Sequence, residues 1–212
     1  ALSLPETLIS TAGIHPHQAK LYSSENFSEI KDLLKLDQVK AIGETGLDFY
    51  RNFSTKEKQK KSFEAHIEIA LDLQIPLFLH VREAHKTFME MLKPLSDDLP
   101  KVVVHCFTGT KEELAEYIEM DFYIGITGWI CDERRGSHLK ELLPLIPIDR
   151  LLSETDSPYL IPRNLDQIKT KRNEPRFLPH IVKEISSNLD QDNSIVCSSI
   201  YANSFNFFHL TK

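Results

Sequence analysis

The sequence has 212 residues, of which 41% are hydrophobic and 26% charged, which is typical of a soluble globular protein, and we expect one domain over residues 1–212. No hydrophobic run approaches the ~20 residues of a membrane-spanning helix, and residues 1–10 lack the basic start of a signal peptide, so we expect neither membrane insertion nor export. The formal net charge of −6 argues against a protein that coats nucleic acid with a broad basic face.

Short hydrophobic runs rich in β-branched residues predict six strands. Each run is hydrophobic on both faces, as in a parallel strand that lies between helices and a packed core. The predicted strands are Leu8 to Ile14, Val39 to Gly43, Pro76 to Leu79, Lys101 to Val104, Phe122 to Gly125, and Leu151 to Ser153.

Amphipathic segments between and after these strands predict helices. Thr55 and Thr110 are typical helix starts because acidic residues follow both, and Pro175 suits a first helical position. The predicted helices are Asn26 to Leu36, Thr55 to Leu73, His85 to Leu92, Lys111 to Glu119, Leu139 to Leu145, Pro175 to about Asn188, and Asn193 to about Phe208.

This alternation predicts an α/β fold, either an open doubly wound sheet or a closed barrel. The barrel is favoured because no glycine-rich phosphate loop follows a strand, whereas polar residues end nearly every strand. Because six strands are visible, we predict a TIM-type (βα)8 barrel that lacks its first one or two βα units; two units of ~25 residues would restore the ~250 residues typical of this fold. A six-stranded barrel is the alternative.

Metal-ligating residue types stand at the C-terminal ends of five of the six predicted strands. In chain order they are His15 and His17, Glu44, His80, His105, and Glu154 with Asp156. In a parallel barrel these ends meet on the face where the loops build the active site. A single such histidine is more often a hydrogen-bonded core or loop residue than a ligand, but the repeated position favours a shared site for one or two divalent ions.

Six segments resemble the successive motifs of the TatD deoxyribonuclease family of metal-dependent hydrolases. They are GIHPH (13–17), AIGETGLDF (41–49), HCFTGT (105–110), ITGWICDERRG (126–136), ETDSPYLIPR (154–163) and RNEP (172–175). They follow the family order over nearly the whole chain, so the resemblance is highly specific. GWICDERRG and the following LLPLIP are most similar to the bacterial members of the family.

The resemblance implies a divalent-metal site in which Glu44 and Asp156 are catalytic. Glu44 would be a metal ligand that bridges two ions, His80 and His105 would be imidazole ligands, and Asp156 would bind metal and orient or deprotonate the attacking water. Magnesium is the expected ion, with manganese or zinc as alternatives, and one or two ions are expected. Many family members also carry a histidine pair on the first strand of the barrel, which by our strand count lies outside this sequence.

Other polar residues near the strand ends suit substrate binding. We predict that His15 and His17 donate to a phosphate oxygen or to the leaving group. The alternative is that these histidines only fix the conformation of the loop that contains them. Arg82 suits a phosphate clamp because a guanidinium matches two phosphate oxygens, with surface solvation as the alternative. Glu154 shares a strand face with Asp156, and we predict that it supports a metal ligand.

Three aromatic residues and one cysteine near the strand ends have open roles. Phe107, Trp129 and Tyr159 suit stacking on unpaired bases, with core packing as the alternative for at least one of them. Cys106 is adjacent to His105, but no further partner supports a nucleophile, so we predict a buried and unreactive thiol.

Phosphodiester hydrolysis is the chemistry that this predicted site suits, because bound divalent ions activate water and stabilise the attacking and leaving oxygens. The resemblance implies a 3′–5′ exonuclease acting on single-stranded DNA and also on RNA, with DNA repair as an expectation at the level of the family. We further expect a monomer that does not associate with membranes.

Two other functions stay open. The first is a metal-dependent amidohydrolase or lactonase acting on a small molecule, although no predicted strand ends in the lysine that bridges metals in some such enzymes. The second is a nucleic-acid-binding protein without catalytic activity. An oligonucleotide that is bound without release of nucleotides would distinguish it from a nuclease.

The cysteines and the distribution of cations complete the prediction. Three widely spaced cysteines without a CxxC pair suit a reducing compartment, so we expect a cytoplasmic protein. Cations gather locally despite the acidic total, either as solvated helix faces and loops or as phosphate-binding clusters. These clusters are Lys56, Lys58, Lys60 and Lys61; Arg134 and Arg135; and Lys169, Lys171, Arg172 and Arg176.

Overall fold

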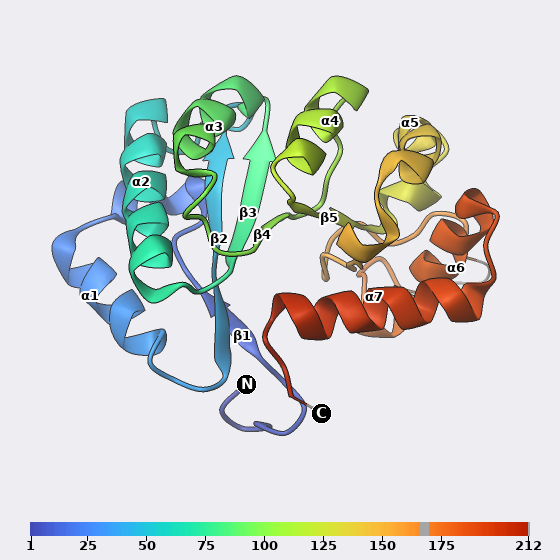
Figure 1. Cartoon of the computed structure of the whole chain (residues 1–212), viewed down its shortest axis with the longest axis horizontal. Coiled ribbons are helices and arrows are strands. Elements are labelled where there is room, and N and C mark those ends of the chain that lie inside the picture. The colour runs from blue at the N-terminus through green and yellow to red at the C-terminus, as the bar shows by residue number, and fades with distance from the viewer. Residues whose placement is uncertain (166–169, 212) are drawn as a thin grey trace. The chain divides into compact units, whose positions relative to one another are not determined.

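A computed structural model describes residues 1–165 and 170–211 (Figure 1). The chain forms two compact units, the first of residues 1–104 with Phe207–His209, and the second of residues 105–206 with the segment from Leu210 onward. Lys169 of the predicted cation clusters lies outside the described residues.

In the first unit, the described residues form four parallel strands in the order β1-β2-β3-β4. The strands are β1 (Ser10–Ala12), β2 (Val39–Asp48), β3 (Leu77–Arg82) and β4 (Val102–Val104). The helices α1 (Ser24–Leu33), α2 (Lys56–Leu73) and α3 (His85–Leu92) connect successive strands. Figure 1 shows α2 and α3 beside β2 and β3. This unit therefore consists of consecutive βαβ passages, as the sequence predicts.

The core of the first unit combines hydrophobic side chains from strands and helices. Those that are completely buried include Ile42, Leu47, Leu77 and Leu79 from the strands and Phe63 and Phe88 from the helices. The rings of Phe63 and Phe88 stack with their centroids 5.5 Å apart, which joins α2 to α3. Burial of each such side chain contributes about 1.5–3 kcal/mol, so this core fixes the strands that carry the polar residues described below.

In the second unit, β5 (Tyr123–Ile126) and β6 (Leu151–Ser153) pair in parallel. Its helices are α4 (Lys111–Glu119), α5 (Ser137–Leu142), α6 (Leu178–Leu189) and α7, which runs over Asn193–Phe207. The residues around Pro175 form a short 3-10 helix, Pro175–Phe177, before α6 begins.

Both helix starts predicted at threonines are confirmed. The side chain of Thr55 accepts a hydrogen bond from the backbone N–H of Lys58. Thr110 and Glu113 form a capping box, in which each side chain accepts a hydrogen bond from the backbone N–H of the other. Such caps satisfy backbone N–H groups that have no partner within the helix.

The predicted ends of the first three strands are wrong. β1 is shorter than Leu8 to Ile14, β2 continues past Gly43 to Asp48, and β3 continues past Leu79 to Arg82. The extension of β2 has a structural cause, because its added residues pair with β3, Gly46 with His80 and Asp48 with Arg82. Glu44 therefore lies within a strand, with four further strand residues after it.

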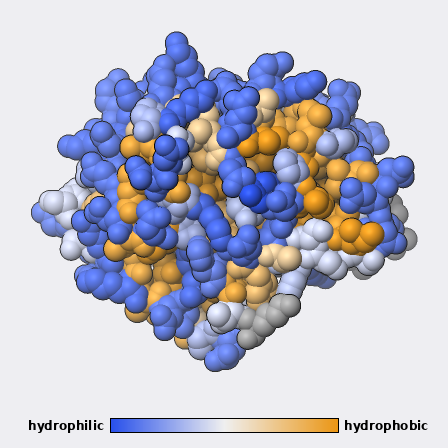
Figure 2. Space-filling model, in the orientation of Figure 1, coloured by the Kyte–Doolittle hydropathy of each residue, from blue (hydrophilic) through white to orange (hydrophobic). Residues whose placement is uncertain are grey.

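The face of the molecule drawn in Figure 2 is largely hydrophilic. Figure 2 shows hydrophilic residues over most of the visible face, with hydrophobic residues between them. Charged residues make up 26% of the sequence, which accounts for this pattern. Within the described part of the chain, no helix has the length and hydropathy needed to cross a membrane.

Candidate metal and active site

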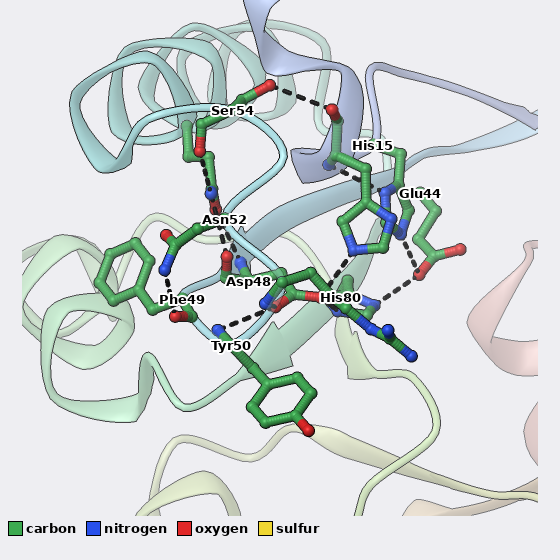
Figure 3. Close-up of polar contacts among 11 residues, drawn as sticks. His15, Glu44, Asp48, Phe49, Tyr50, Asn52, Ser54 and His80 are labelled. Carbon is green, nitrogen blue, oxygen red and sulfur yellow. Dashed lines mark hydrogen bonds and ion pairs between the residues drawn. The ribbon is translucent and has the colours of Figure 1, made fainter.

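Glu44 lies between two imidazoles in the first unit (Figure 3). Its Oε1 is 3.3 Å from Nε2 of His15 and 2.9 Å from Nδ1 of His80. Nδ1 of His15 accepts a hydrogen bond from the backbone N–H of His17, so the proton of a neutral His15 ring is on Nε2, facing Glu44. One carboxylate from β2 thus contacts His15, which lies in the segment after β1, and His80 of β3.

Asp48 is the most deeply buried polar residue of this group, with 1% of its surface exposed. Its Oδ2 lies 2.7 Å from Nε2 of His17 and 3.3 Å from Nε2 of His80. Its Oδ1 accepts hydrogen bonds from the backbone N–H groups of Tyr50 and Arg51, at 3.0 and 2.7 Å. One buried carboxylate therefore orients two imidazoles and the first turn of the following loop.

The charge of Asp48 is stabilised by these hydrogen bonds. Burial raises the pKa of Asp48, but hydrogen bonds from His80, the Arg51 backbone and His17 together hold it well below its ordinary value. Burial lowers the pKa of His17, and Asp48 compensates only in part. For His80, burial also lowers the pKa, but Asp48 and Glu44 more than compensate and raise it.

The backbone before His15 is fixed by a buried histidine of α2. The N–H of Ile14 donates to Nε2 of His66 at 3.0 Å, and Nδ1 of His66 donates to the carbonyl of Ser62 at 2.6 Å. Burial lowers the pKa of His66 to about 4. The ring is therefore neutral at physiological pH, which leaves Nε2 free to accept the Ile14 N–H.

Close approach of neighbouring strands at Gly43 positions Glu44. The φ angle of Gly43 is 155°, and a Cβ at this position would lie 2.8 Å from Cβ of Phe78. A Cβ at Gly13 would in turn lie 2.9 Å from Cα of Gly43. Only glycine fits this geometry without displacement of the backbone that carries Glu44.

A second polar group lies in the second unit, around His105 and the residues after β6. Nδ1 of His105 is 2.6 Å from Oε2 of Glu154, and its Nε2 is 3.6 Å from Oδ1 of Asp156. The same Oε2 of Glu154 accepts the backbone N–H of Cys106 at 3.0 Å. Burial lowers the pKa of His105, but Glu154 and Asp156 more than compensate and raise it well above its ordinary value.

Gly125 of β5 leaves room for the Glu154 carboxylate. A Cβ at Gly125 would lie 3.0 Å from Oε2 of Glu154 and closer still to its other oxygen. The backbone N–H of Glu154 donates to the carbonyl of Ile126 at 2.9 Å, which fixes β6 beside β5. The glycine therefore allows Glu154 to reach His105.

Each unit brings together three side chains whose donor atoms suit a divalent ion. In the first unit they are His15, His17 and His80, and in the second they are His105, Cys106 and Asp156; within each group the donor atoms lie within 4.8 Å of one another. Imidazole suits zinc and related ions, and carboxylate suits magnesium and manganese. Burial raises the pKa of Cys106 to about 12, so without a bound ion this thiol is protonated at neutral pH.

The structure brings together many of the residues that sequence analysis singled out. Glu44 and His80 lie together in the first unit, and the same unit places His15 and His17 against them. His105, Glu154 and Asp156 lie together in the second unit. The guanidinium of Arg82 lies 4.2 Å from the ring centroid of Tyr50.

Sequence analysis missed Asp48, although the motif AIGETGLDF contains it. The signal was present, because Asp48 follows Glu44 by four residues, and side chains four apart in a strand share a face. It was overlooked because the strand was predicted to end before Glu44.

The aromatic residues expected to stack on bases differ in exposure. Phe107 is buried, with 3% of its surface exposed, whereas Tyr159 is 70% exposed. Trp129 is half-buried, with the guanidinium of Arg135 5.4 Å from its ring centroid.

A family model described as TatD related DNase matches residues 1–209. The chain belongs to this family. The TatD family match covers all the polar groups described above, and so the predicted resemblance is confirmed.

Bacterial relatives of this TatD family chain are about half identical to it. A protein of Citrobacter rodentium named 3'-5' ssDNA/RNA exonuclease TatD is 49% identical over 203 residues, which cover 95% of this chain and 77% of that protein. The Escherichia coli K12 protein of the same name is 50% identical over 195 residues, covering 92% of this chain and 75% of that protein.

Solved structures of the TatD family have the same fold. A TatD family hydrolase from Entamoeba histolytica matches with a TM-score of 0.86 at 28% identity, over 100% of this chain and 80% of the other. A TatD homologue from Escherichia coli K12 matches with a TM-score of 0.88 at 23% identity, over 99% of this chain and 81% of the other. The predicted fold class, an α/β fold of the TIM-barrel type, is confirmed.

Proposed function

We propose that this TatD family chain is a divalent-metal-dependent nuclease that removes nucleotides from the 3′ end of single-stranded DNA and RNA. The observation that carries the proposal is the group of three imidazoles around Glu44 and Asp48. It occurs in a chain about 50% identical to proteins named 3'-5' ssDNA/RNA exonuclease TatD, and these names support the polarity and the substrate class.

Glu44 and His80 in the first unit and His105 and Asp156 in the second are the residues that would hold metal. Their nitrogen and oxygen atoms fit magnesium or manganese, with zinc as the alternative for the imidazole-rich group, and we propose magnesium as the ion. When bound, such an ion supplies Lewis acidity toward a phosphoryl oxygen and lowers the pKa of water.

The proton transfers are assigned to the protein's own carboxylates. Asp156 would orient the attacking water and accept its proton at Oδ1, the atom that lies 3.6 Å from Nε2 of His105. Glu154 would act through His105, because its Oε2 lies 2.6 Å from Nδ1 of that ring and fixes the orientation of the imidazole.

His15 and His17 would bind the phosphate of the substrate. Both rings lie beside His80, with centroids 4.8 and 6.0 Å from it, which also makes a role as metal ligands sterically feasible. The two roles differ in their kinetic effect. Loss of a phosphate contact raises KM, whereas loss of a ligand raises the metal concentration needed for half-maximal activity.

Incubation of the protein with single-stranded oligonucleotides labelled at either end tests the proposed function. With magnesium or manganese, we expect mononucleotides to be released from the 3′ end, and a chelator or Glu44→Ala to abolish release. Glu64→Ala changes an exposed glutamate of α2 and serves as the matched control. Release that continues in chelator, or the absence of release with any divalent ion, would contradict the proposal.

A further inference from the structure

The loop between β2 and α2, residues 49–54, exposes two large aromatic side chains. Tyr50 is 53% exposed and Phe53 is 59% exposed. Figure 3 shows the ring of Tyr50 directed away from Asp48 and His80. One exposed aromatic residue needs no explanation, but this loop exposes two within four residues, directly after Asp48 of the polar group. We call residues 49–54 the aromatic loop.

Buried polar side chains fix the aromatic loop at both ends. At its start, Oδ1 of Asp48 accepts the backbone N–H groups of Tyr50 and Arg51. At its end, Nε2 of Gln59 donates to the carbonyl of Ser54 at 2.8 Å, and also to the carbonyl of Asp48 at 2.9 Å. Because Asp48, Ser54 and Gln59 are all buried, the exposed rings project from a preorganised loop.

Two arginines flank the ring of Tyr50. The guanidinium carbon of Arg82 is 4.2 Å from the ring centroid, and that of Arg51 is 5.7 Å from it. Among the described residues, no carboxylate forms an ion pair with either guanidinium. On a chain whose formal net charge is −6, these two cations are available to an external anion.

The aromatic loop is continuous with the candidate active site. The ring centroid of Phe53 lies 4.9 Å from that of His17. The hydroxyl of Ser54 donates to the carbonyl of His17 at 3.0 Å, which joins the end of the loop to the histidine segment. A ligand with a phosphate at the imidazoles would therefore have its adjoining parts beside Phe53 and Tyr50.

We propose that the aromatic loop is the subsite for the bases next to the scissile phosphate of a single-stranded nucleic acid. Tyr50 and Phe53 stack on unpaired bases, and Arg51 and Arg82 bind the phosphates between them. An occupant of this kind matches the surface because flat apolar bases alternate with anionic phosphates along its chain, as rings alternate with guanidinium groups here. The inference rests on the proposed nuclease function and names residues that bind its substrate.

Alanine and conservative variants of the two rings test this subsite. With a 3′-labelled single-stranded oligonucleotide and magnesium or manganese, Tyr50→Ala and Phe53→Ala should each raise KM about tenfold, the cost typical of losing one stacked base. Tyr50→Phe and Phe53→Tyr keep an aromatic face and should restore KM. Tyr201→Ala removes a tyrosine with a matching exposure of 55% on α7 and should leave KM unchanged.

Substrates that lack bases show whether the alanine substitutions weaken binding through lost stacking or through a change in the conformation of the loop. On an oligonucleotide with abasic residues next to the scissile bond, the unsubstituted protein should lose affinity, and the alanine variants should bind no worse than it does. Arg82→Gln should weaken binding of normal and abasic oligonucleotides alike, and should reduce the slope of log affinity against log salt by about 1.

These experiments distinguish failure of the proposed subsite from failure of the proposed nuclease function. An unchanged KM in both alanine variants, or a loss that persists on abasic substrates, would overturn the stacking role while the exonuclease assignment stands. If the unsubstituted protein releases no nucleotide, the proposed function fails instead. Fluorescence anisotropy of a 5′-labelled oligonucleotide in chelator then tests the subsite separately, where each alanine variant should weaken binding about tenfold and equal binding would refute the subsite.

Discussion

Asp48 connects the imidazoles of His17 and His80 with the backbone at the start of the aromatic loop. Its carboxylate is buried and negatively charged, and it accepts hydrogen bonds on both oxygens. A buried carboxylate of this kind fixes which ring nitrogen carries the proton and the direction in which the opposite nitrogen points.

Asp48→Asn should impair activity without unfolding the protein. The amide oxygen can still accept hydrogen bonds from the backbone N–H groups of Tyr50 and Arg51, but the amide nitrogen cannot accept a hydrogen bond from either imidazole. We expect kcat/KM on an oligonucleotide to fall about 10–100-fold, as is typical when the partner of a ligand is lost. Asp72→Asn on the exposed face of α2 is the control. An equal fall in kcat/KM in that variant would show that the effect is not specific to Asp48.

His66 should make the free energy of unfolding depend on pH. The folded-state pKa is about 4 and the ordinary value is 6.5, so the unfolded chain takes up this proton first as the pH falls. The contribution of His66 is complete above pH 6.5 and is lost progressively toward pH 4, by roughly 2 kcal/mol between pH 7.5 and 5.0.

Urea unfolding of His66→Gln at pH 7.5 and 5.0 measures this dependence. The variant removes the titrating group, so its stability should change less between the two pH values than that of the unsubstituted protein. His138→Gln, which replaces an exposed histidine, should behave like the unsubstituted protein. Identical pH dependence in His66→Gln would show that His66 does not titrate as its burial implies.

Sequence patterns single out individual residues of ligand type but not their buried partners. Glu44, His80 and Asp156 follow hydrophobic runs, so their places in the chain predict that their side chains lie at or near strand ends. Asp48 and His66 act through burial and through contacts with distant residues, such as the 3.0 Å hydrogen bond from Ile14 to His66. Such contacts depend on packing between elements, which local periodicity does not contain.

At the scale of elements, β2 shows where prediction from periodicity stops. Its first part, Val39 to Gly43, has the β-branched and small hydrophobic residues of a buried strand, and this start is confirmed. Its second part contains Glu44, Gly46 and Asp48, whose local preferences do not indicate a strand. That part is extended because β3 pairs with it, so a tertiary interaction determines its structure.

The pairing of β5 with β6 makes Gly125 important for Glu154. Gly125→Ala would place a methyl group where the carboxylate of Glu154 now lies, and the carboxylate would have to move away from His105. We expect activity on an oligonucleotide to fall about 10–100-fold, because His105 loses its orienting partner. Circular dichroism should show a folded protein, and full activity in a folded Gly125→Ala variant would contradict the positioning role of this glycine.

At the scale of the whole molecule, the described residues of each unit contain one polar group with donors for a divalent ion. The strand-helix order that repeats through both units is evident in the sequence, which is why the α/β class and most helix bounds are predicted correctly. The predicted barrel type needed the shared motifs and the solved TatD family structures for confirmation.

Binding of a divalent ion should stabilise the molecule as a whole. A ligand that binds only the folded state stabilises it by about 2.7 kcal/mol at 100 times its Kd, which corresponds to a rise in Tm of roughly 5–10 °C for a protein of this size. We expect this rise with manganese or magnesium, and a smaller rise in His80→Ala and in His105→Ala. The exposed His138→Ala should keep the full rise, and equal shifts in all variants would place the ion elsewhere.

Release of nucleotides from a 3′-labelled single-stranded oligonucleotide measures most directly whether each polar group is needed for metal-dependent hydrolysis. Glu44→Gln changes the group of the first unit, and Asp156→Asn changes that of the second, each with little change in shape. We predict that either substitution lowers the rate of release with magnesium or manganese by at least about 100-fold. A rate close to that of the unsubstituted protein in either variant would contradict the role proposed for the substituted residue in hydrolysis.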